Sequence, residues 1–569
     1  MPELTIEQLL QKAVMHHQAG EAELAQTLYL QILAKEPRHA DALHLLGVLQ
    51  AQCGEFATAI TWIQRAVTIM PQEVRFYNSL GNTYKGMGQF EAAIAAYRQA
   101  IDLAPNSAEA YNNLGILFYQ QGNTDEALKH YATAVNLNPG YVDAHYNLAI
   151  LFLKQGKLDA AIKQFSNVVK LFPASVTAQK NLADLYLQRG NYAAAVKRYK
   201  KVLKLQPTYV DALNNLGATM LKLAEPEEAA SYFTQALEID EKHVDARNNL
   251  AAVYLQQNKY EAASKHYVEL LQHNANDIEA HYNLGVALMA LGHLDKAKQH
   301  FTEVITHQPQ HFDAYMNLAA VCLKQGLVEA AQKCYLQAQT LQPDNPIIAY
   351  MLSALTAVSP PVRAPAAYVE NLFDNYAGYF EQQVTTTLHY QVPQLLQQAI
   401  SRLVEKPTLP WKILDLGCGS GLCGDAFHEL AQLLVGVDLS AKMLEFTQRK
   451  NIYNKLIKGD IVTVVTQQPQ QHYDLILAAD VFVYFGDLSE IFKQCHRVLR
   501  PGGLFAFSTE QEEHQPYVLR STARYAQSNA YIENLAQQFG FSCVVVENIT
   551  PRLQENEPVP GSLFVLRKS

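Results

Sequence analysis

The chain has 569 residues and a formal net charge of −9. This length exceeds what one hydrophobic core supports, so we expect two or more domains. The acidic balance argues against a nucleic-acid partner, because binding phosphates requires clustered lysine and arginine.

The cysteines and the N-terminal residues indicate the cellular compartment in which we expect the protein. Seven cysteines are scattered without a C-x-x-C pair, so neither a disulfide framework nor a metal site is predicted. The opening MPELTIEQLL lacks a basic segment, and no run of 18 apolar residues occurs in the chain,. We therefore expect a soluble, cytoplasmic protein with no membrane partner.

From about residue 6 to 345 the chain follows a 34-residue period. A small residue such as Gly81 recurs in each period, and an aromatic such as Tyr97 recurs sixteen residues later. These features predict helix pairs with small residues where two helices cross, an aromatic between pairs, and proline where a helix stops. The prolines on the grid are Pro37, Pro71, Pro105, Pro139, Pro173, Pro207, Pro309 and Pro343.

This period resembles that of the tetratricopeptide repeat. Ten repeats are expected from about residue 6 to 345, followed by an apolar helix at 345–358 that seals the last repeat. The resemblance implies an all-α solenoid over residues 1–358.

One column of the repeats consists of asparagine, a weak helix former whose repetition suggests a role for the side chain. A carboxamide can pair with the backbone of an extended peptide. The column is similar to the asparagine ladder of the O-linked N-acetylglucosamine transferase repeats, which implies a protein or peptide in the concave groove. Alternatively, each asparagine bonds its neighbouring repeat, or duplication copied it. The column comprises Asn113, Asn147, Asn181, Asn215, Asn249, Asn283 and Asn317.

A proline-rich segment at 359–366 is predicted to be a short, stiff linker,. Beyond it, ILDLGCGSGLCG at 413–424 predicts a strand, a tight turn and a helix start. Glycines in such a turn let backbone N–H groups approach a ligand that a Cβ would exclude. The stretch predicts a cradle for a nucleotide-type cofactor. Its last three glycines also fit the dinucleotide pattern G-x-G-x-x-G, so a nicotinamide-dependent oxidoreductase is an alternative.

The segments that follow decide between these cofactors. Asp415 ends the first strand, Asp438 ends a second at LVGVD, and Asp460 follows a third. Strands at 473–480 and 499–508 complete the series. In this order the motifs resemble those of class I S-adenosylmethionine-dependent methyltransferases. The resemblance implies a doubly wound, Rossmann-like α/β domain over residues 367–569.

The resemblance also implies a set of cofactor contacts. The carboxylate of Asp438 is expected to accept hydrogen bonds from the ribose hydroxyls, and the helical leader at 367–390 to fold over the cofactor. Tyr376 in that leader would touch the methionine moiety, although core packing is the competing explanation. The expected cofactor residues are Asp415, Gly417, Gly419, Gly421, Asp438, Leu439, Met443, Asp460, Ile461 and Tyr376.

Methyl transfer from a sulfonium mainly requires alignment and exclusion of water, so no obligatory base is predicted. Asp480 and Tyr484 are candidates for acceptor contacts because they follow the fourth strand,. Asp480 alternatively caps the next helix. The long segment 508–529 is a predicted substrate lid. Its candidate side chains are Glu510, His514, Arg520, Arg524 and Tyr525.

The motifs together indicate an S-adenosylmethionine-dependent methyltransferase (EC 2.1.1.-) whose repeats recruit a protein or peptide. Two alternatives remain from the sequence. In one, the enzyme methylates a small molecule while the repeats only assemble a complex. In the other, the chain is a scaffold with an inactive methyltransferase-like domain.

Overall fold

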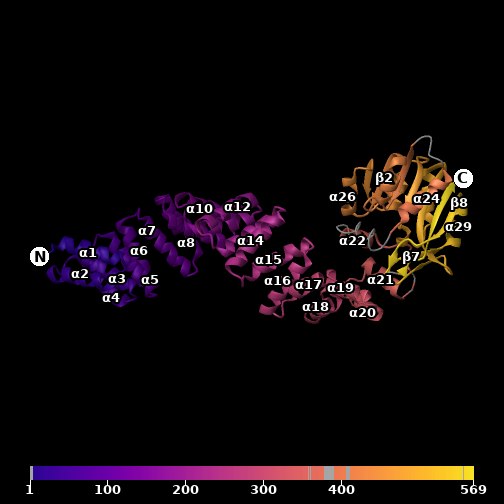
Figure 1. The fold of residues 1–569 in the computed structure, drawn as a ribbon. Helices are drawn as coiled ribbons and strands as arrows, with labels where there is room; N and C mark the ends of the chain where they lie inside the picture. The colour runs from indigo at the N-terminus through magenta and orange to yellow at the C-terminus, as the bar shows by residue number, and fades with distance from the viewer. Residues whose placement is uncertain (1–3, 357, 359, 377–389, 405–409, 555–556) are drawn as a thin grey trace. The chain divides into compact units, whose positions relative to one another are not determined.

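The computed structural model describes residues 4–356, 358, 360–376, 390–404, 410–554 and 557–569. It divides into two compact units, Met1–Ala275 and Asn276–Ser569 (Figure 1). The second unit joins the last repeats to the C-terminal α/β region, so the boundaries at 358 and 367 remain a prediction. Among the described residues, no helix is both long enough and apolar enough to span a bilayer.

The first unit consists of helix pairs (Figure 1). Its helices are α1 (Ile6–Gln18), α2 (Ala22–Lys35), α3 (Ala40–Gln52), α4 (Phe56–Ile69), α5 (Val74–Gly86), α6 (Phe90–Leu103), α7 (Ala108–Gln120), α8 (Thr124–Leu137), α9 (Val142–Lys154), α10 (Leu158–Leu171), α11 (Val176–Gln188), α12 (Tyr192–Leu205), α13 (Val210–Lys222), α14 (Pro226–Ile239), α15 (Val244–Gln256) and α16 (Tyr260–His273). The predicted helical solenoid is confirmed.

Glycine and an aromatic ring meet where the two helices of a pair cross. A Cβ on Gly81 of α5 would lie 2.5 Å from the ring of Tyr97 in α6. At the same crossing in the next pair, a Cβ on Gly115 would lie 2.7 Å from Tyr131. The aromatic therefore fills the crossing within one pair, whereas the sequence suggested the gap between pairs. The ring can occupy this position because glycine leaves space for it.

The second unit begins with the last repeats. Its first helices are α17 (Ile278–Ala290), α18 (Leu294–His307), α19 (Phe312–Lys324), α20 (Val328–Leu341) and α21 (Pro346–Thr356). Ile348 and Tyr350 of α21 are buried in one hydrophobic cluster with Tyr335 of α20 and Tyr525 of the α/β region. The predicted sealing helix α21 thus packs against both the last repeat and the α/β region.

The α/β region follows the expected alternation of helices and strands (Figure 1). Its elements are α22 (Ala366–Tyr376), α24 (Val392–Leu403), β1 (Trp411–Leu416), α25 (Leu422–Phe427), η2 (His428–Leu430), β2 (Ala431–Asp438), α26 (Ala441–Lys450), β3 (Lys455–Lys458), α27 (Ile461–Gln467), β4 (Tyr473–Ala478), η3 (Phe482–Tyr484), α28 (Ser489–Val498), β5 (Leu499–Glu512), β6 (Tyr517–Leu519), β7 (Tyr525–Ser528), α29 (Asn529–Gln538), β8 (Phe541–Ile549), β9 (Leu553–Gln554), β10 (Glu557–Pro558) and β11 (Gly561–Lys568).

The central sheet has the order β3-β2-β1-β4-β5-β11-β8. Strands β3, β2, β1, β4 and β5 are parallel, and β11 is antiparallel to both of its neighbours. Alternate residues of a strand face two different cores, as Leu475 and Ile476 of β4 do. The doubly wound α/β prediction is confirmed. Strand order reverses at β1 and β4, and such a switch point is where open α/β sheets bind ligands.

The described part of the proline-rich segment runs along the α/β region. The backbone N–H of Ala364 donates to the carbonyl of Tyr484 at 2.8 Å, and the N–H of Gly486 donates to the carbonyl of Val362 at 2.9 Å. Arg363 and Phe485 form an isolated antiparallel bridge. The segment is therefore held on the α/β region by backbone hydrogen bonds.

Candidate functional site

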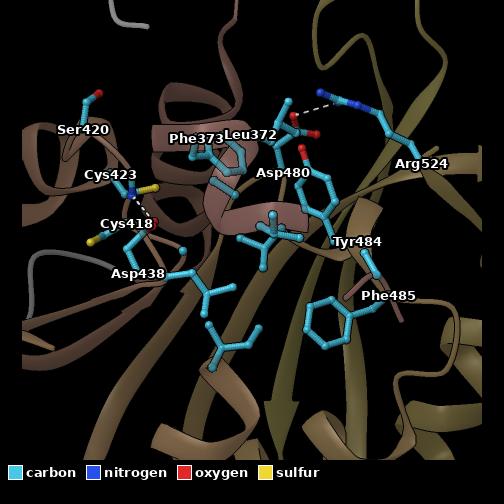
Figure 2. Close-up of a pocket in the computed structure, with 18 of the residues that line it drawn as sticks. Leu372, Phe373, Cys418, Ser420, Cys423, Asp438, Asp480, Tyr484, Phe485 and Arg524 are labelled. Carbon is cyan, nitrogen blue, oxygen red and sulfur yellow. Dashed lines mark hydrogen bonds and ion pairs between the residues drawn. The ribbon is translucent and has the colours of Figure 1, made fainter. Parts of the chain in front are cut away.

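A cavity of about 450 Å³ lies at the carboxyl ends of β1, β2 and β4. Its walls come from the glycine turn after β1, the ends of β2 and β3, the residues after β4, and helix α22. In Figure 2, Cys418, Ser420 and Asp438 lie on one side and Asp480, Tyr484 and Arg524 on the other. Six predicted cofactor residues line it: Gly417, Gly419, Asp438, Leu439, Asp460 and Ile461.

The glycine turn needs glycine at its first position. Gly417 has φ +69°, in the left-handed region, and a Cβ there would lie 2.6 Å from the Val481 side chain. Any other residue would bring both backbone strain and a clash at this point. Gly421, at φ +88°, precedes α25 and does not line the cavity. The main chain is thus exposed to a ligand mainly through Gly417 and Gly419.

Asp438 ties the end of β2 to the glycine turn. Its Oδ2 accepts from the N–H of Gly419 at 2.9 Å, and its Oδ1 accepts from the N–H of Ser440 at 2.8 Å. Burial raises the pKa of this carboxyl. A carboxylate has about four acceptor sites, so each oxygen can take a further hydrogen bond from a ligand hydroxyl.

Asp415 lies behind the glycine turn and does not line the cavity. Its side chain is 1% exposed, and its Oδ2 accepts a hydrogen bond of 2.5 Å from the Tyr453 hydroxyl. Its Oδ1 is buried and has no hydrogen-bond partner among the residues the structure describes. Burial raises the pKa of Asp415 to about 7. The carboxyl thus holds the turn through Tyr453 and keeps one oxygen unmet.

Two more residues, Met443 and Tyr376, are predicted to contact the cofactor. Met443 is fully buried below the end of β2 and is not a lining residue, although its N–H donates to the Ser440 hydroxyl at 3.1 Å. Tyr376 ends α22, and its side chain lies outside the described residues. The contacts of Met443 and Tyr376 with a cofactor remain predictions.

Asp460 is already engaged on both oxygens. Its Oδ1 accepts from the N–H of Thr463 at 3.1 Å and caps α27, and its Oδ2 accepts from Arg363 Nη1 at 2.9 Å. Arg363 also lines the cavity. No sequence motif marks this arginine, which lies in the proline-rich segment 97 residues before its partner.

Helix α22 covers one side of the cavity with apolar side chains. Tyr368, Val369, Leu372 and Phe373 line it, and Leu372 and Phe373 are drawn in Figure 2. The Ser440 hydroxyl donates to Asp374 of the same helix, which ties α22 to the end of β2. Within the leader, helix α22 therefore lies over the cavity, and residues 377–389 of the predicted leader lie outside the described residues.

Charged side chains gather on the opposite side. Asp480 lines the cavity with φ +56°, a left-handed value that is uncommon among residues other than glycine but that aspartate adopts more readily than most,. Both of its oxygens accept from Arg552 Nη1 at 2.9 Å, so it does not cap the following helix. Arg552 also donates to Glu510. Arg552 belongs to no sequence motif and lies 72 residues from Asp480, so no short-range pattern predicts the pair.

Comparison with known families is consistent with this geometry. A family model described as a methyltransferase domain matches residues 414–507. Tetratricopeptide repeat models match residues 15–74, 78–142, 146–210, 180–243 and 232–263. A model of the middle TPR-like domain of cilia and flagella-associated protein 70 matches residues 248–358. The chain therefore carries tetratricopeptide repeats and a methyltransferase domain.

Individual relatives match parts of the chain. The ubiquinone biosynthesis O-methyltransferase of Bradyrhizobium sp. is 30% identical over 109 residues, which are 19% of this chain and 43% of the relative. The malonyl-[acyl-carrier protein] O-methyltransferase of Halalkalibacterium halodurans is 32% identical over 150 residues, 25% of this chain and 54% of the relative. The chain thus spans about half the length of the curated relatives it matches. A solved structure of YrrB, described as a TPR protein with an unusual peptide-binding site, is 21% identical and covers 32% of this chain and 95% of its own, with a TM-score of 0.30.

Tyr484 of the methyltransferase domain is 6% exposed and lines the cavity. Burial raises the pKa of its phenol, so at neutral pH the hydroxyl is protonated and can donate a hydrogen bond,. Cys418 and Cys423 also line the cavity, and burial raises the pKa of both thiols well above the usual value. Neither cysteine is activated as a nucleophile.

The predicted lid is part of the sheet. β5 continues to Glu512, and β7 pairs with its last residues while β6 pairs with β7. Glu510 and Tyr525 are buried, whereas His514 is exposed. Arg520 donates to the carbonyl of Gln511 at 2.6 Å. Among the lid candidates, only Arg524 lines the cavity.

The asparagine column joins successive tetratricopeptide repeats. Nδ2 of Asn147 donates to Asn112 Oδ1 at 3.0 Å, and Nδ2 of Asn249 donates to Asn214 Oδ1 at 2.9 Å, in each case 35 residues back. Similar bonds run from Asn181 to Tyr146, from Asn215 to Asp184 and from Asn317 to Tyr282. Asn113 and Asn283 make no side-chain hydrogen bond within the described residues. These bonds favour the structural alternative for part of the column, and peptide binding remains a prediction.

Proposed function

We propose that the C-terminal domain transfers a methyl group from S-adenosylmethionine, and that the repeats recruit the protein or peptide that carries the acceptor. The observation that carries the proposal is the cavity at the strand switch point, where the main chain of Gly417 and Gly419 meets the carboxylate of Asp438,.

The residues present fit such a cofactor. Glycine at 417 leaves main chain open where a Cβ would clash, and Asp438 retains acceptor capacity for ribose hydroxyls. Asp415 keeps a buried oxygen without a partner in the described structure, behind the same turn. A ligand with a sulfonium and an ammonium group brings positive charge toward these two carboxyls.

A nicotinamide dinucleotide fits less well. The antiparallel β11 between β5 and β8 departs from the strand order 3-2-1-4-5-6 of dinucleotide-binding sheets,. Asp438 does not discriminate, because dinucleotide sites also use an acid there for the ribose. The strand order therefore supports the methyl donor over the dinucleotide.

When bound, S-adenosylmethionine supplies a methyl group on a sulfonium, and its transfer consumes positive charge without an obligatory base. The chain's own residues would align the partners and exclude water. Asp438 would hold the ribose, Leu372 and Phe373 would close the cavity from α22, and Tyr484 would donate a hydrogen bond to the acceptor.

The role proposed for the repeats rests on their general use as binding surfaces for peptides and proteins. The free thiols of all seven cysteines support a reducing compartment, and we place the protein in the cytoplasm,.

Methylation of a small molecule is the second candidate, because the matched relatives are named as O-methyltransferases of ubiquinone biosynthesis and of malonyl-[acyl-carrier protein]. In that case the repeats would only assemble a complex. The two candidates predict different locations for the transferred methyl group.

The test uses the immobilised full-length chain. It is incubated with an extract of the cells that produce it, washed, and supplied with S-adenosylmethionine carrying a radiolabelled methyl group. Label in the retained protein supports recruitment, and label only in low-mass products supports the second candidate. Calorimetry with S-adenosylmethionine and with NADH is the accompanying control. Absence of S-adenosylmethionine binding would overturn the proposal and favour an inactive domain.

A further inference from the structure

Five charged side chains form what we term the acceptor cluster, on the side of the cavity opposite Asp438. It contains two carboxylates and three guanidinium groups. Its members are Asp480, Glu510, Arg520, Arg524 and Arg552. The cluster therefore carries one surplus positive charge.

The carboxylates of the cluster are satisfied without Arg524. Arg552 donates to both oxygens of Asp480 and to Oε1 of Glu510. Oε2 of Glu510 accepts from Arg520 Nη1 at 3.3 Å. Arg552 is only 5% exposed, so its pairing with the two acids is part of the folded core. The surplus charge is thus that of Arg524.

Arg524 stands near these acids without a hydrogen bond to them. Its Nη1 lies 3.6 Å from Asp480 Oδ2 and 3.8 Å from Glu510 Oε1. This nitrogen is buried and has no hydrogen-bond partner in the part of the chain that the structure describes. A buried guanidinium N–H without an acceptor is unfavourable, so the position is suited to an acceptor supplied by a ligand.

Arg524 is also placed where the methyl acceptor would lie. It lines the cavity, and its guanidinium carbon is 5.9 Å from the centre of the Tyr484 ring. Figure 2 shows it beside Asp480 and Tyr484, across the cavity from Asp438 and Cys418. The wall between the two sides is apolar, with Leu372, Phe373 and Phe485. A ligand here meets one cation beside an apolar surface.

We propose that the methyl acceptor of this domain is a carboxylate with an apolar body, bound through Arg524. This inference rests on the proposed methyltransferase function and names its substrate class. A single negative charge balances the one surplus cation. A phosphate dianion would overcompensate it and would be repelled by Asp480 and Glu510. The planar guanidinium also matches the geometry of a carboxylate.

The reaction balances without a base. A carboxylate oxygen forms the new C–O bond to the methyl group, the C–S bond breaks, and its electron pair stays on sulfur. The products are a neutral methyl ester and a thioether, and no proton is transferred. Because the ester has lost its charge, its attraction to Arg524 is lost, which favours release.

A binding experiment tests the role of Arg524 without turnover. The probes are 3-phenylpropanoate and its neutral isostere 3-phenylpropanamide, titrated by calorimetry into the full-length chain loaded with S-adenosylhomocysteine. The acid is expected to bind at least tenfold more tightly than the amide. Arg524→Gln should abolish this preference. Arg500→Gln is the matched control. Arg500 lies near the start of β5, pairs with Asp474 of β4 and does not line the cavity.

Arg524→Lys guards against a folding defect in the glutamine variant. It keeps the charge, so it should retain a preference for the acid, and thermal unfolding of both variants is compared with that of the unmodified chain. Equal binding of acid and amide to the unmodified chain would overturn the inference, and so would an unchanged preference in Arg524→Gln.

The carboxylate could belong to a small molecule or to a protein or peptide, and a labelling experiment separates these sources. After transfer of a radiolabelled methyl group in cell extract, alkali should release the label as volatile methanol, because methyl esters are base-labile. Separating the products by mass assigns the ester to one source. Base-stable label would overturn the carboxylate assignment while leaving the methyltransferase proposal intact. Failure of the chain to bind S-adenosylmethionine would instead overturn the proposed methyltransferase function on which this inference rests.

Discussion

The hydroxyl of Tyr350 donates a hydrogen bond of 2.6 Å to the backbone carbonyl of Ala523. Tyr350 belongs to α21, the helix that follows the last repeat, and Ala523 precedes Arg524 with φ +57°. Tyr350 is fully buried. The end of the repeat array thus fixes the turn that carries the proposed acceptor-binding arginine.

Replacing Tyr350 by phenylalanine is expected to destabilise this contact. The change removes the donor and leaves a buried carbonyl unmet, which costs about 1–3 kcal/mol. The melting temperature of the second unit should fall, and the preference of the cavity for 3-phenylpropanoate should weaken because Arg524 is less well held. Tyr77→Phe is the control, since that hydroxyl donates to the carbonyl of Pro71 in an exposed setting. If Tyr350→Phe and Tyr77→Phe changed the melting temperature and the preference for 3-phenylpropanoate equally, Tyr350 would have no role in positioning Arg524.

Asp438→Asn tests the cofactor side of the cavity. The asparagine keeps the size of the side chain but replaces one acceptor oxygen with a donor that faces the N–H of Gly419 or Ser440. Affinity for S-adenosylmethionine, measured by calorimetry, should fall by about 1–3 kcal/mol. The control Asp425→Asn changes a carboxylate of α25 that pairs with Lys450 and does not line the cavity. Unchanged affinity in Asp438→Asn would remove this residue from the cofactor site.

Asp415 should make stability depend on pH. Its pKa rises from 3.8 to about 7 on folding because the carboxyl is buried. The folded state then binds the proton more tightly than the unfolded chain does. The contribution of this group to stability is therefore fully present below about pH 4 and is lost as the pH rises to about 7. Above that range it is constant.

Asp415→Asn is expected to flatten this part of the pH profile, because the side chain no longer titrates. Denaturant unfolding at intervals between pH 4 and 8 measures the slope, and Asp425→Asn, which removes a half-exposed carboxylate paired with Lys450, serves as the control. A variant whose stability fell with pH as steeply as that of the unmodified chain would assign the slope to other groups.

The sequence predicted features that short-range patterns encode. The proline and glycine grid specified the helix pairs, because each repeat places the same residues at the same crossing. Gly417 and Asp438 were identified because strand ends and tight turns impose local requirements. Ion pairs between residues far apart in the sequence are not encoded by any short-range pattern. Arg552 meets Asp480 only because β11 and its neighbours bring the two segments together, and Arg363 reaches Asp460 from a segment without a motif.

The asparagine column illustrates a second limit. Its position on the first helix of each pair follows from the period, but the direction in which each carboxamide bonds does not. The residue 35 positions back does not decide whether Nδ2 meets the preceding repeat. It is asparagine for Asn147 and Asn249, which bond it, and also for Asn113 and Asn283, which do not bond it in the described structure. The same period therefore accommodated both a structural and a binding role.

The column offers its own matched test of these roles. Asn147 and Asn249 bond the preceding repeat, whereas Asn113 and Asn283 make no side-chain bond in the described structure. Replacing the first two by alanine should lower stability by about 1–3 kcal/mol per site, because Asn112 and Asn214 lose a partner. Replacing the second two should leave the thermal transition nearly unchanged.

Capture of the recruited protein then separates the two interpretations. If the column binds a peptide, the Asn113→Ala, Asn283→Ala variant should retain less partner on the immobilised chain while melting at the usual temperature. The bonded pair should also lose capture, but with a lower melting temperature. Full capture by the stable variant would show that these two asparagines do not contact the partner. Loss of stability alone, in the bonded pair, would then identify the column as a set of links between repeats.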